Sequence, residues 1–96
     1  MAQASNPSPL LPELFSVQEW RAIAAHLGLS DQQARIARWI CRGLGNEAIA
    51  KRLGVSRDTI RMHTRVLYKK LRIKTRIGVP VFTVLAARTV MQTRQL

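Results

Sequence analysis

The chain has 96 residues, enough for one small domain, and 47% of them are hydrophobic, which excludes a chain too polar to fold. Sixteen Lys and Arg face five Asp and Glu, so the formal net charge of +11 favours a polyanion partner, either nucleic acid or an anionic membrane surface. A basic chain without such a partner is the alternative.

The cysteine content and the hydropathy of the sequence indicate in which cellular compartment the protein is expected. Cys41 is the only cysteine, which excludes an intramolecular disulfide, and its apolar neighbours favour a buried structural thiol. The first fifteen residues lack the basic-then-apolar order of a signal peptide, and no apolar run approaches the ~18 residues of a membrane span. We therefore expect a cytoplasmic protein without a membrane partner.

Three prolines within residues 1–15 predict an irregular segment there, and a helix is predicted to follow over 16–28. Ser16 and Glu19 fit a capping box, and Gly28 fits a left-handed helix end. The residues expected to face inward recur at helical spacing: Val17, Trp20, Ala24 and Leu27. Phe15 is expected to pack on Trp20 as a hydrophobic staple.

Two further helices are predicted from the same kinds of signal. Ser30 and Gln33 form a second capping box that opens a helix over 31–42, with Ala37, Ile40 and Cys41 facing inward. After two glycines, Asn46 is expected to cap a short helix that reaches Leu53. Its inward residues are Ile49, Ala50 and Leu53. Gly54 ends it, and Val55 is expected to pack inside the turn that follows.

A longer helix is predicted over 57–71, capped by Ser56. Ile60, Thr64, Leu67 and Leu71 form its core stripe. Arginine or lysine at positions 57, 61, 65, 69 and 72 falls opposite or beside that stripe. Like charges four residues apart repel each other, so this face indicates an external polyanion more than an ordinary solvated helix face. Between Arg57 and Arg76 stand eight of the sixteen basic residues and one acid, Asp58.

The last element, residues 79–91, has the Val, Phe and Thr content of a strand as well as of a helix. A helix is preferred because the chain offers no partner strand, and Pro80 then lies in the first turn. The predicted fold class is therefore all-α.

The short helix, the tight turn Gly54-Val55-Ser56 and the longer basic helix together predict a DNA-binding helix-turn-helix. An arginine on the second helix can bond both major-groove acceptors of guanine, a contact worth about 1–3 kcal/mol of discrimination. Lysines and the helix N-terminus can contact phosphates, which fix the register but read no sequence.

At these residues the sequence resembles the LuxR/GerE-type helix-turn-helix family of bacterial transcription regulators. The matching positions are Leu29-Ser30, Gly43, Asn46, Ile49-Ala50, Leu53, Ser56, Thr59-Ile60-Arg61, His63, Leu67, Lys70-Leu71 and Lys74-Thr75-Arg76. The resemblance implies a four-helix domain over 29–96, preceded by the additional helix over 16–28. Its third helix would read DNA and its fourth would form the dimer contact.

The resemblance also implies the roles of individual residues. The implied base contacts are Arg61, Met62 and Arg65. Asn46, Thr59, His63, Lys70 and Arg76 match positions that touch phosphate or brace the helix, although His63 equally suits a helix-packing histidine. The expected phosphate contacts also include Ser56, Arg57, Lys69, Lys74 and Thr75. Departures from the family pattern include Arg72 at a site that is often Gly and Val66 at one that is often Asn. Many relatives carry a receiver or ligand-binding domain, which residues 1–29 are too few to form, so the chain resembles the stand-alone members.

The expected dimer surface lies on the last helix and comprises Val81, Val84, Leu85, Arg88 and Val90; packing beneath the domain is the alternative. Two other functions stay open. One is a domain similar to region 4 of sigma factors that acts through RNA polymerase, and the other is a non-specific binder of nucleic acid or anionic surfaces. An enzyme is not expected, because the acids are scattered and no metal-ligand cluster or phosphate-binding glycine loop is present in the sequence. No metal and no cofactor is expected.

Overall fold

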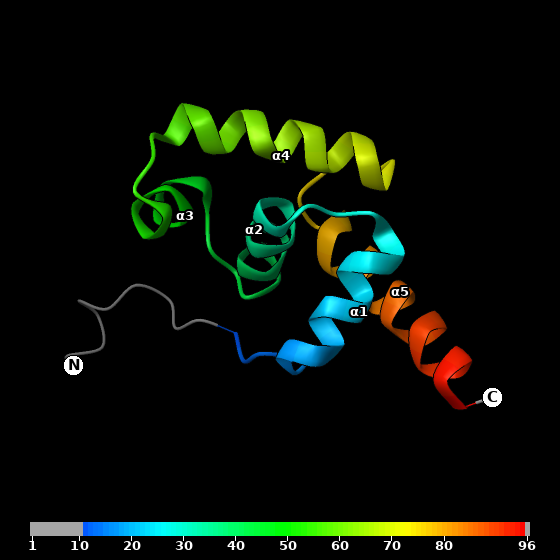
Figure 1. Cartoon of the computed structure of the whole chain (residues 1–96). Helices are drawn as coiled ribbons and strands as arrows, with labels where there is room; N and C mark the ends of the chain where they lie inside the picture. Colours follow the sequence, from blue (N-terminus) through cyan, green and yellow to red (C-terminus); the bar gives the residue numbers. More distant parts are fainter. Residues whose placement is uncertain (1–10, 96) are drawn as a thin grey trace.

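The computed structural model describes residues 11–95, and within that range the chain forms five helices and no strand (Figure 1). The helices are α1 (Val17–Leu27), α2 (Asp31–Cys41), α3 (Asn46–Leu53), α4 (Arg57–Leu71) and α5 (Gly78–Gln95). The predicted all-α fold is confirmed. Residues 1–10 of the predicted irregular segment lie outside the described residues, and residues 11–16 form no helix.

Local capping signals set where the first two helices begin. The Ser16 hydroxyl accepts from the N–H of Glu19 at 3.1 Å, and the Glu19 carboxylate accepts from the N–H of Ser16 at 2.7 Å. Ser30 and Gln33 repeat this capping box at 3.1 and 2.9 Å. Both predicted starts are confirmed, because each box satisfies two of the N–H groups that a helix start leaves unpaired. α2 ends at Cys41, one residue before the predicted end.

The core gathers apolar side chains from all five helices, and its α1 face differs from the prediction. Trp20 and Ile23 are buried, whereas Val17 is 52% exposed. α1 packs against both α2 and α5, which turns Ile23 inward in place of Val17. The Phe15 ring meets Trp20 edge-on with 5.4 Å between ring centroids, so the predicted staple is confirmed.

The corner between α3 and α4 depends on close packing. Ala50 is 4% exposed and Ile60 is fully buried, while Gly54 adopts φ +71° and ends α3 in the left-handed conformation. The expected inward packing of Val55 is wrong, because its side chain is 37% exposed. Its backbone holds the turn instead: the Val55 N–H donates to the Ala50 carbonyl at 3.1 Å.

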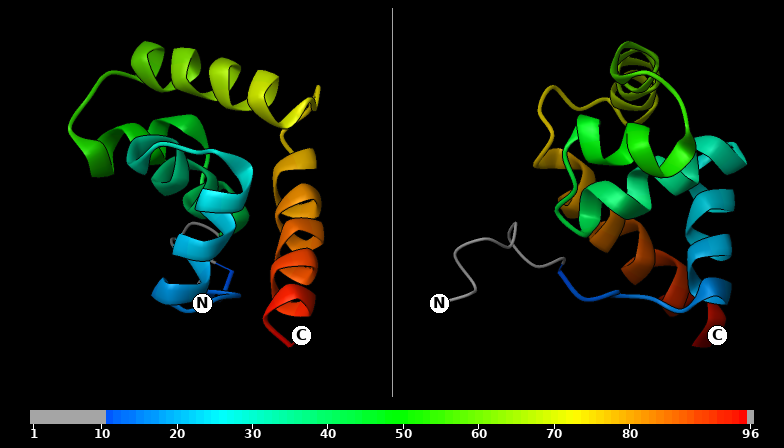
Figure 2. Two further views of the ribbon diagram at one scale, coloured as in Figure 1. Left: turned by 45° about the vertical axis from the view of Figure 1, so that its right-hand side comes forward. Right: turned by 90° about the vertical axis from the view of Figure 1, so that its left-hand side faces the viewer.

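α5 confirms the choice of a helix over a strand, and it is longer than predicted at both ends. Its buried side comprises Val79, Thr83, Ala86 and Ala87. Figure 2 shows α1 and α5 side by side at one end of the molecule, with α4 crossing at the other. None of the helices described is both long enough and apolar enough to cross a bilayer.

Candidate nucleic-acid interface

The start of α4 is fixed by side-chain hydrogen bonds. The Ser56 hydroxyl accepts from the N–H of Thr59 at 3.1 Å, and the hydroxyls of Ser56 and Thr59 lie 2.9 Å apart. The predicted cap is therefore confirmed, and these two candidate phosphate contacts are joined in one cap. A capped helix start still presents the N–H groups of its first two residues outward, where they favour an anion.

The inner side of α4 anchors it to the rest of the molecule. Ile60 and Leu67 are completely buried, and Thr64 and Leu71 are at most 4% exposed, which confirms the predicted stripe. The Thr64 hydroxyl donates to the Arg61 carbonyl at 2.8 Å, so its burial leaves no unpaired donor. With this side held by α2 and α3, the opposite side of α4 is fixed in orientation.

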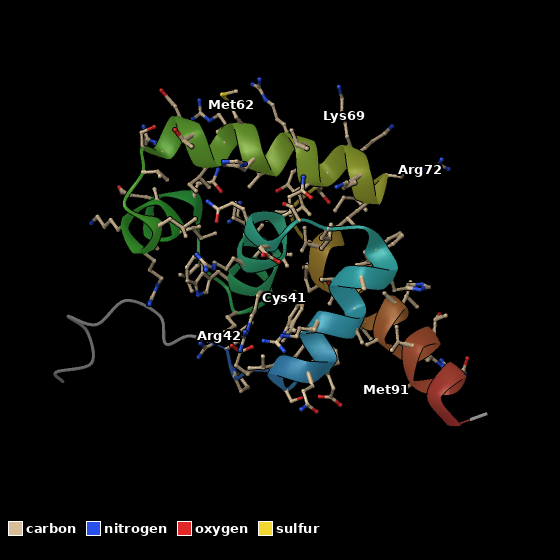
Figure 3. The ribbon with its side chains drawn as sticks, in the orientation of Figure 1. Cys41, Arg42, Met62, Lys69, Arg72 and Met91 are labelled. Carbon is tan, nitrogen blue, oxygen red and sulfur yellow. The ribbon has the colours of Figure 1, made fainter. Side chains whose placement is uncertain are left out.

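The outer side of α4 is exposed along its whole length. The candidate base contacts Arg61, Met62 and Arg65 all lie there, with Met62 67% exposed. Met62 and Lys69 point away from the other helices (Figure 3). Asp58, the helix's one acid, lies 4.0 Å from Arg61 in a largely solvated pair, which constrains Arg61 little.

Val66 belongs to the same surface, and the sequence reasoning missed its exposure. Its side chain is 49% exposed and it stands four residues after Met62, so the two lie on the same side of the helix. That spacing from an outward methionine was the available signal. An apolar pair within an arginine-rich face can contact the methyl group of thymine.

The remaining candidate phosphate contacts surround this outer surface. Arg57, Lys69, Lys74 and Thr75 are exposed, and His63 is half-buried. Lys70 is exposed but already bonded: its Nζ donates to the Gln33 Oε1 at 2.9 Å, at the start of α2. The structure thus places Lys70 at the junction of two helices, beside the capping box of α2.

Arg76 and Asn46 are brought together into one pair. The Arg76 guanidinium donates from Nη1 to Asn46 Oδ1 and from Nη2 to the Leu44 carbonyl, both at 2.7 Å. Asn46 therefore does not cap α3 as predicted; Gly45 takes the cap position, without a side-chain hydrogen bond. The half-buried Arg76 joins the α4–α5 connector to the start of α3.

The candidate dimer surface on α5 is mostly exposed. Val81, Val84 and Leu85 are 57%, 48% and 56% exposed, and Arg88 is also exposed. Val90 is half-buried, so it belongs partly to the internal packing. α5 thus has one side in the core and a second, largely apolar side in solvent.

Cys41 is a buried thiol. Burial raises the pKa of the Cys41 thiol from 9.0 to about 11, against the opposing effect of a hydrogen bond to the hydroxyl of Thr83, 3.8 Å from the sulfur. A thiol of that pKa stays protonated and unreactive near neutral pH. Within residues 11–95, no three His, Cys, Asp or Glu side chains gather closely enough to hold a metal ion.

Comparison with known proteins agrees with this geometry. The family described as bacterial regulatory proteins, luxR family, matches residues 23–82, from within α1 to the first turns of α5. A nitrate/nitrite response regulator protein homolog of Haemophilus influenzae is 36% identical over 53 residues, which are 55% of this chain and 26% of that protein. The nitrate/nitrite response regulator protein NarL of Escherichia coli is 32% identical over 54 residues, 56% of this chain and 25% of NarL.

The chain spans about a quarter of the length of these curated relatives, and no solved structure matches it. The family match covers well over half of the 96 residues, including the complete corner between α3 and α4. The chain therefore belongs to the luxR family of bacterial regulatory proteins.

Proposed function

We propose that this protein binds double-stranded DNA in a sequence-specific way, with α4 in the major groove, and regulates transcription in a bacterium. One observation carries the proposal: α4 buries a single stripe and exposes an opposite side on which arginines flank Met62. At 1.5 Å per residue the helix is about 22 Å long, and the major groove, about 12 Å wide, accepts a helix lengthwise.

Base reading falls to the N-terminal half of α4. Arg61 and Arg65 are exposed and long enough for their planar forks to bond guanine, while Met62 and Val66 offer apolar contact to thymine methyls. Each good arginine–guanine pair contributes about 1–3 kcal/mol of discrimination.

Phosphate contacts come from the cations around this surface and from the start of α4. Arg57, Lys69, Lys70 and Lys74 supply charge at both ends of the helix, and Ser56 and Thr59 lie beside its positive end. His63 and Thr75 complete this set. Arg76 and Asn46 act chiefly by holding α3 in place, because their polar atoms are already bonded to each other.

A homodimer through α5 is part of the proposal. Val81, Val84 and Leu85 form an exposed apolar surface beside Arg88, and Val90 continues it toward the core. Helix-turn-helix dimers bind half-sites about one DNA turn apart, so a two-part operator is expected. Relatives named as response regulators support a regulatory role. A cytoplasmic location is part of the proposal, because that is where bacterial DNA lies.

The test is selection from a random pool of duplex DNA, followed by sequencing of the retained molecules. A two-part enriched motif is expected. Retention without enrichment would leave only the non-specific binder, and no retention would favour the alternative of a sigma-like domain that acts through RNA polymerase. The luxR family match favours the first result.

Two arginine variants on the same helix separate base reading from phosphate contact. Arg61→Ala should weaken binding to the selected motif more than binding to random DNA, whereas Arg57→Ala should weaken both equally. If Arg61→Ala also weakens both equally, Arg61 does not read bases.

A further inference from the structure

An open groove lies between α1 and α2, on a side of the molecule to which α4 contributes nothing. It measures about 530 Å³, and small side chains line much of it, among them Ala24 and Ala34. The half-buried Leu29 and the exposed Val17 add apolar surface, while Trp20, also in the lining, is itself buried. We call it the α1–α2 groove. Val17 is an apolar residue that the core leaves 52% exposed, and an occupant of the groove would cover it.

The groove is cationic as well as apolar. Three arginines line it, Arg21, Arg35 and Arg38, against one acid, Asp31. Arg38 already binds a carboxylate: its Nε lies 2.9 Å from Glu13 Oε2 of the segment before α1. Arg21 and Arg35 are exposed, and no carboxylate within residues 11–95 pairs with either. Of the three arginines that line the groove, one is paired with a carboxylate and two are not.

We propose that the α1–α2 groove docks an acidic amphipathic helix of another protein. The alanines let a helix backbone approach closely, and an apolar row on that helix would cover Val17 and Leu29. Carboxylates beside the row would pair with Arg21 and Arg35. These two unpaired arginines are the reason that the partner helix should be acidic. The lining of the groove comes from α1, α2 and Leu29 between them, and no residue of α4 takes part in it.

Charge argues against the other occupants. A second copy of the chain also carries a net charge of +11, and its acids, Glu13, Glu19, Asp31, Glu47 and Asp58, each stand in a different segment. No segment within 11–95 therefore offers two carboxylates on one face. DNA could pair with the arginines, but its backbone would leave the apolar lining of the groove uncovered.

The test uses the full chain and a synthetic helix-forming peptide with a leucine row flanked by glutamates. Amide chemical shifts of the labelled protein should change along α1 and α2 and not on the outer side of α4. A peptide with glutamine in place of every glutamate and one with serine in place of every leucine should each bind about tenfold more weakly. These peptide controls leave the protein unaltered.

Charge reversal on the protein provides a matched pair. Arg21→Glu with Arg35→Glu should weaken peptide binding about tenfold or more, whereas Lys51→Glu with Arg52→Glu on α3 should change it less than about twofold. Equal weakening by both pairs, or shift changes centred on α4, would show attraction by net charge alone and overturn the proposal. So would a change of oligomeric state in the groove variant, which would identify a second copy as the occupant. Affinity for random DNA, measured alongside, tests the DNA-binding proposal separately.

Discussion

Arg76 tests most directly whether a predicted phosphate contact is in fact a structural brace. Its two hydrogen bonds of 2.7 Å reach Asn46 and the backbone of Leu44, 30 and 32 residues earlier in the chain. Arg76→Ala removes both and leaves the Leu44 carbonyl, in a residue only 4% exposed, without this donor. A net contribution of about 1.5–3 kcal/mol applies to a hydrogen bond with a charged group. Since this pair is only half-buried, we expect a total loss of about 2–3 kcal/mol in the free energy of unfolding.

The assay is equilibrium unfolding in urea, with a second series of variants to apportion the loss. Asn46→Ala should cost about 1 kcal/mol, and the double variant should show a coupling of similar size. Arg76→Lys keeps the charge but loses the planar fork, so it should recover less than half of the stability.

Lys74→Ala is the matched control, because Lys74 is exposed on the same connector and takes part in none of the hydrogen bonds described. It should change the free energy of unfolding by less than about 0.5 kcal/mol. If Arg76→Ala is no more destabilising than Lys74→Ala, the brace contributes nothing and the phosphate contact predicted from the sequence is the better account.

Three further measurements test other parts of the structure. Arg72→Gly should raise the free energy of unfolding by about 0.5–1 kcal/mol. The reason is that Arg72 ends α4 at φ +57°, a backbone conformation that is strained for any residue with a side chain. Arg72→Ala keeps this strain and should give no such gain. Lys70→Ala should lower affinity evenly for all DNA sequences and flatten the salt dependence by about one unit, and a sequence-dependent loss would contradict a phosphate contact. The Cys41 thiol should resist alkylation at neutral pH in the folded protein and react readily in denaturant. Because the folded thiol has the higher pKa, its contribution to the free energy of unfolding is fully present below pH 9.0 and should be lost as the pH rises to about 11. The free energy of unfolding of Cys41→Ala should lack this pH dependence.

Helix starts were predictable because their causes lie within four residues. Ser16 with Glu19 and Ser30 with Gln33 make reciprocal bonds that need nothing beyond their own turn. The stripe of α4 was predictable for a similar reason: only one side of a 15-residue helix lacked charge.

Errors arose where a distant segment decides the outcome. Asn46 has the side chain of a helix cap, but its oxygen is taken by Arg76, 30 residues later. Whether Val17 or Ile23 faces inward depends on where α5 lies against α1, which no local pattern specifies. The bond from Lys70 to Gln33 spans 37 residues and was missed for the same reason.

The outer surface of α4 was predicted only in part. Arginine spacing indicated the exposure of Arg61 and Arg65 because charge is rarely buried unpaired. Val66 was missed because an apolar residue is first assigned to the interior, and only the completed stripe of α4 shows that it has no place there. The roles of these residues on DNA stay predictions.

The distribution of charge along the chain has a kinetic consequence. No acid follows Asp58, and eight of the sixteen basic residues lie between Arg57 and Arg76. Positive charge is therefore densest on α4 and the connector that follows it, which gives the molecule a dipole moment about its centre. At ionic strengths where the Debye length is about 10 Å, the field of DNA turns such a dipole before contact. If α4 enters the major groove as proposed, this orientation would shorten the rotational search that precedes docking, and the association rate should fall steeply with added salt.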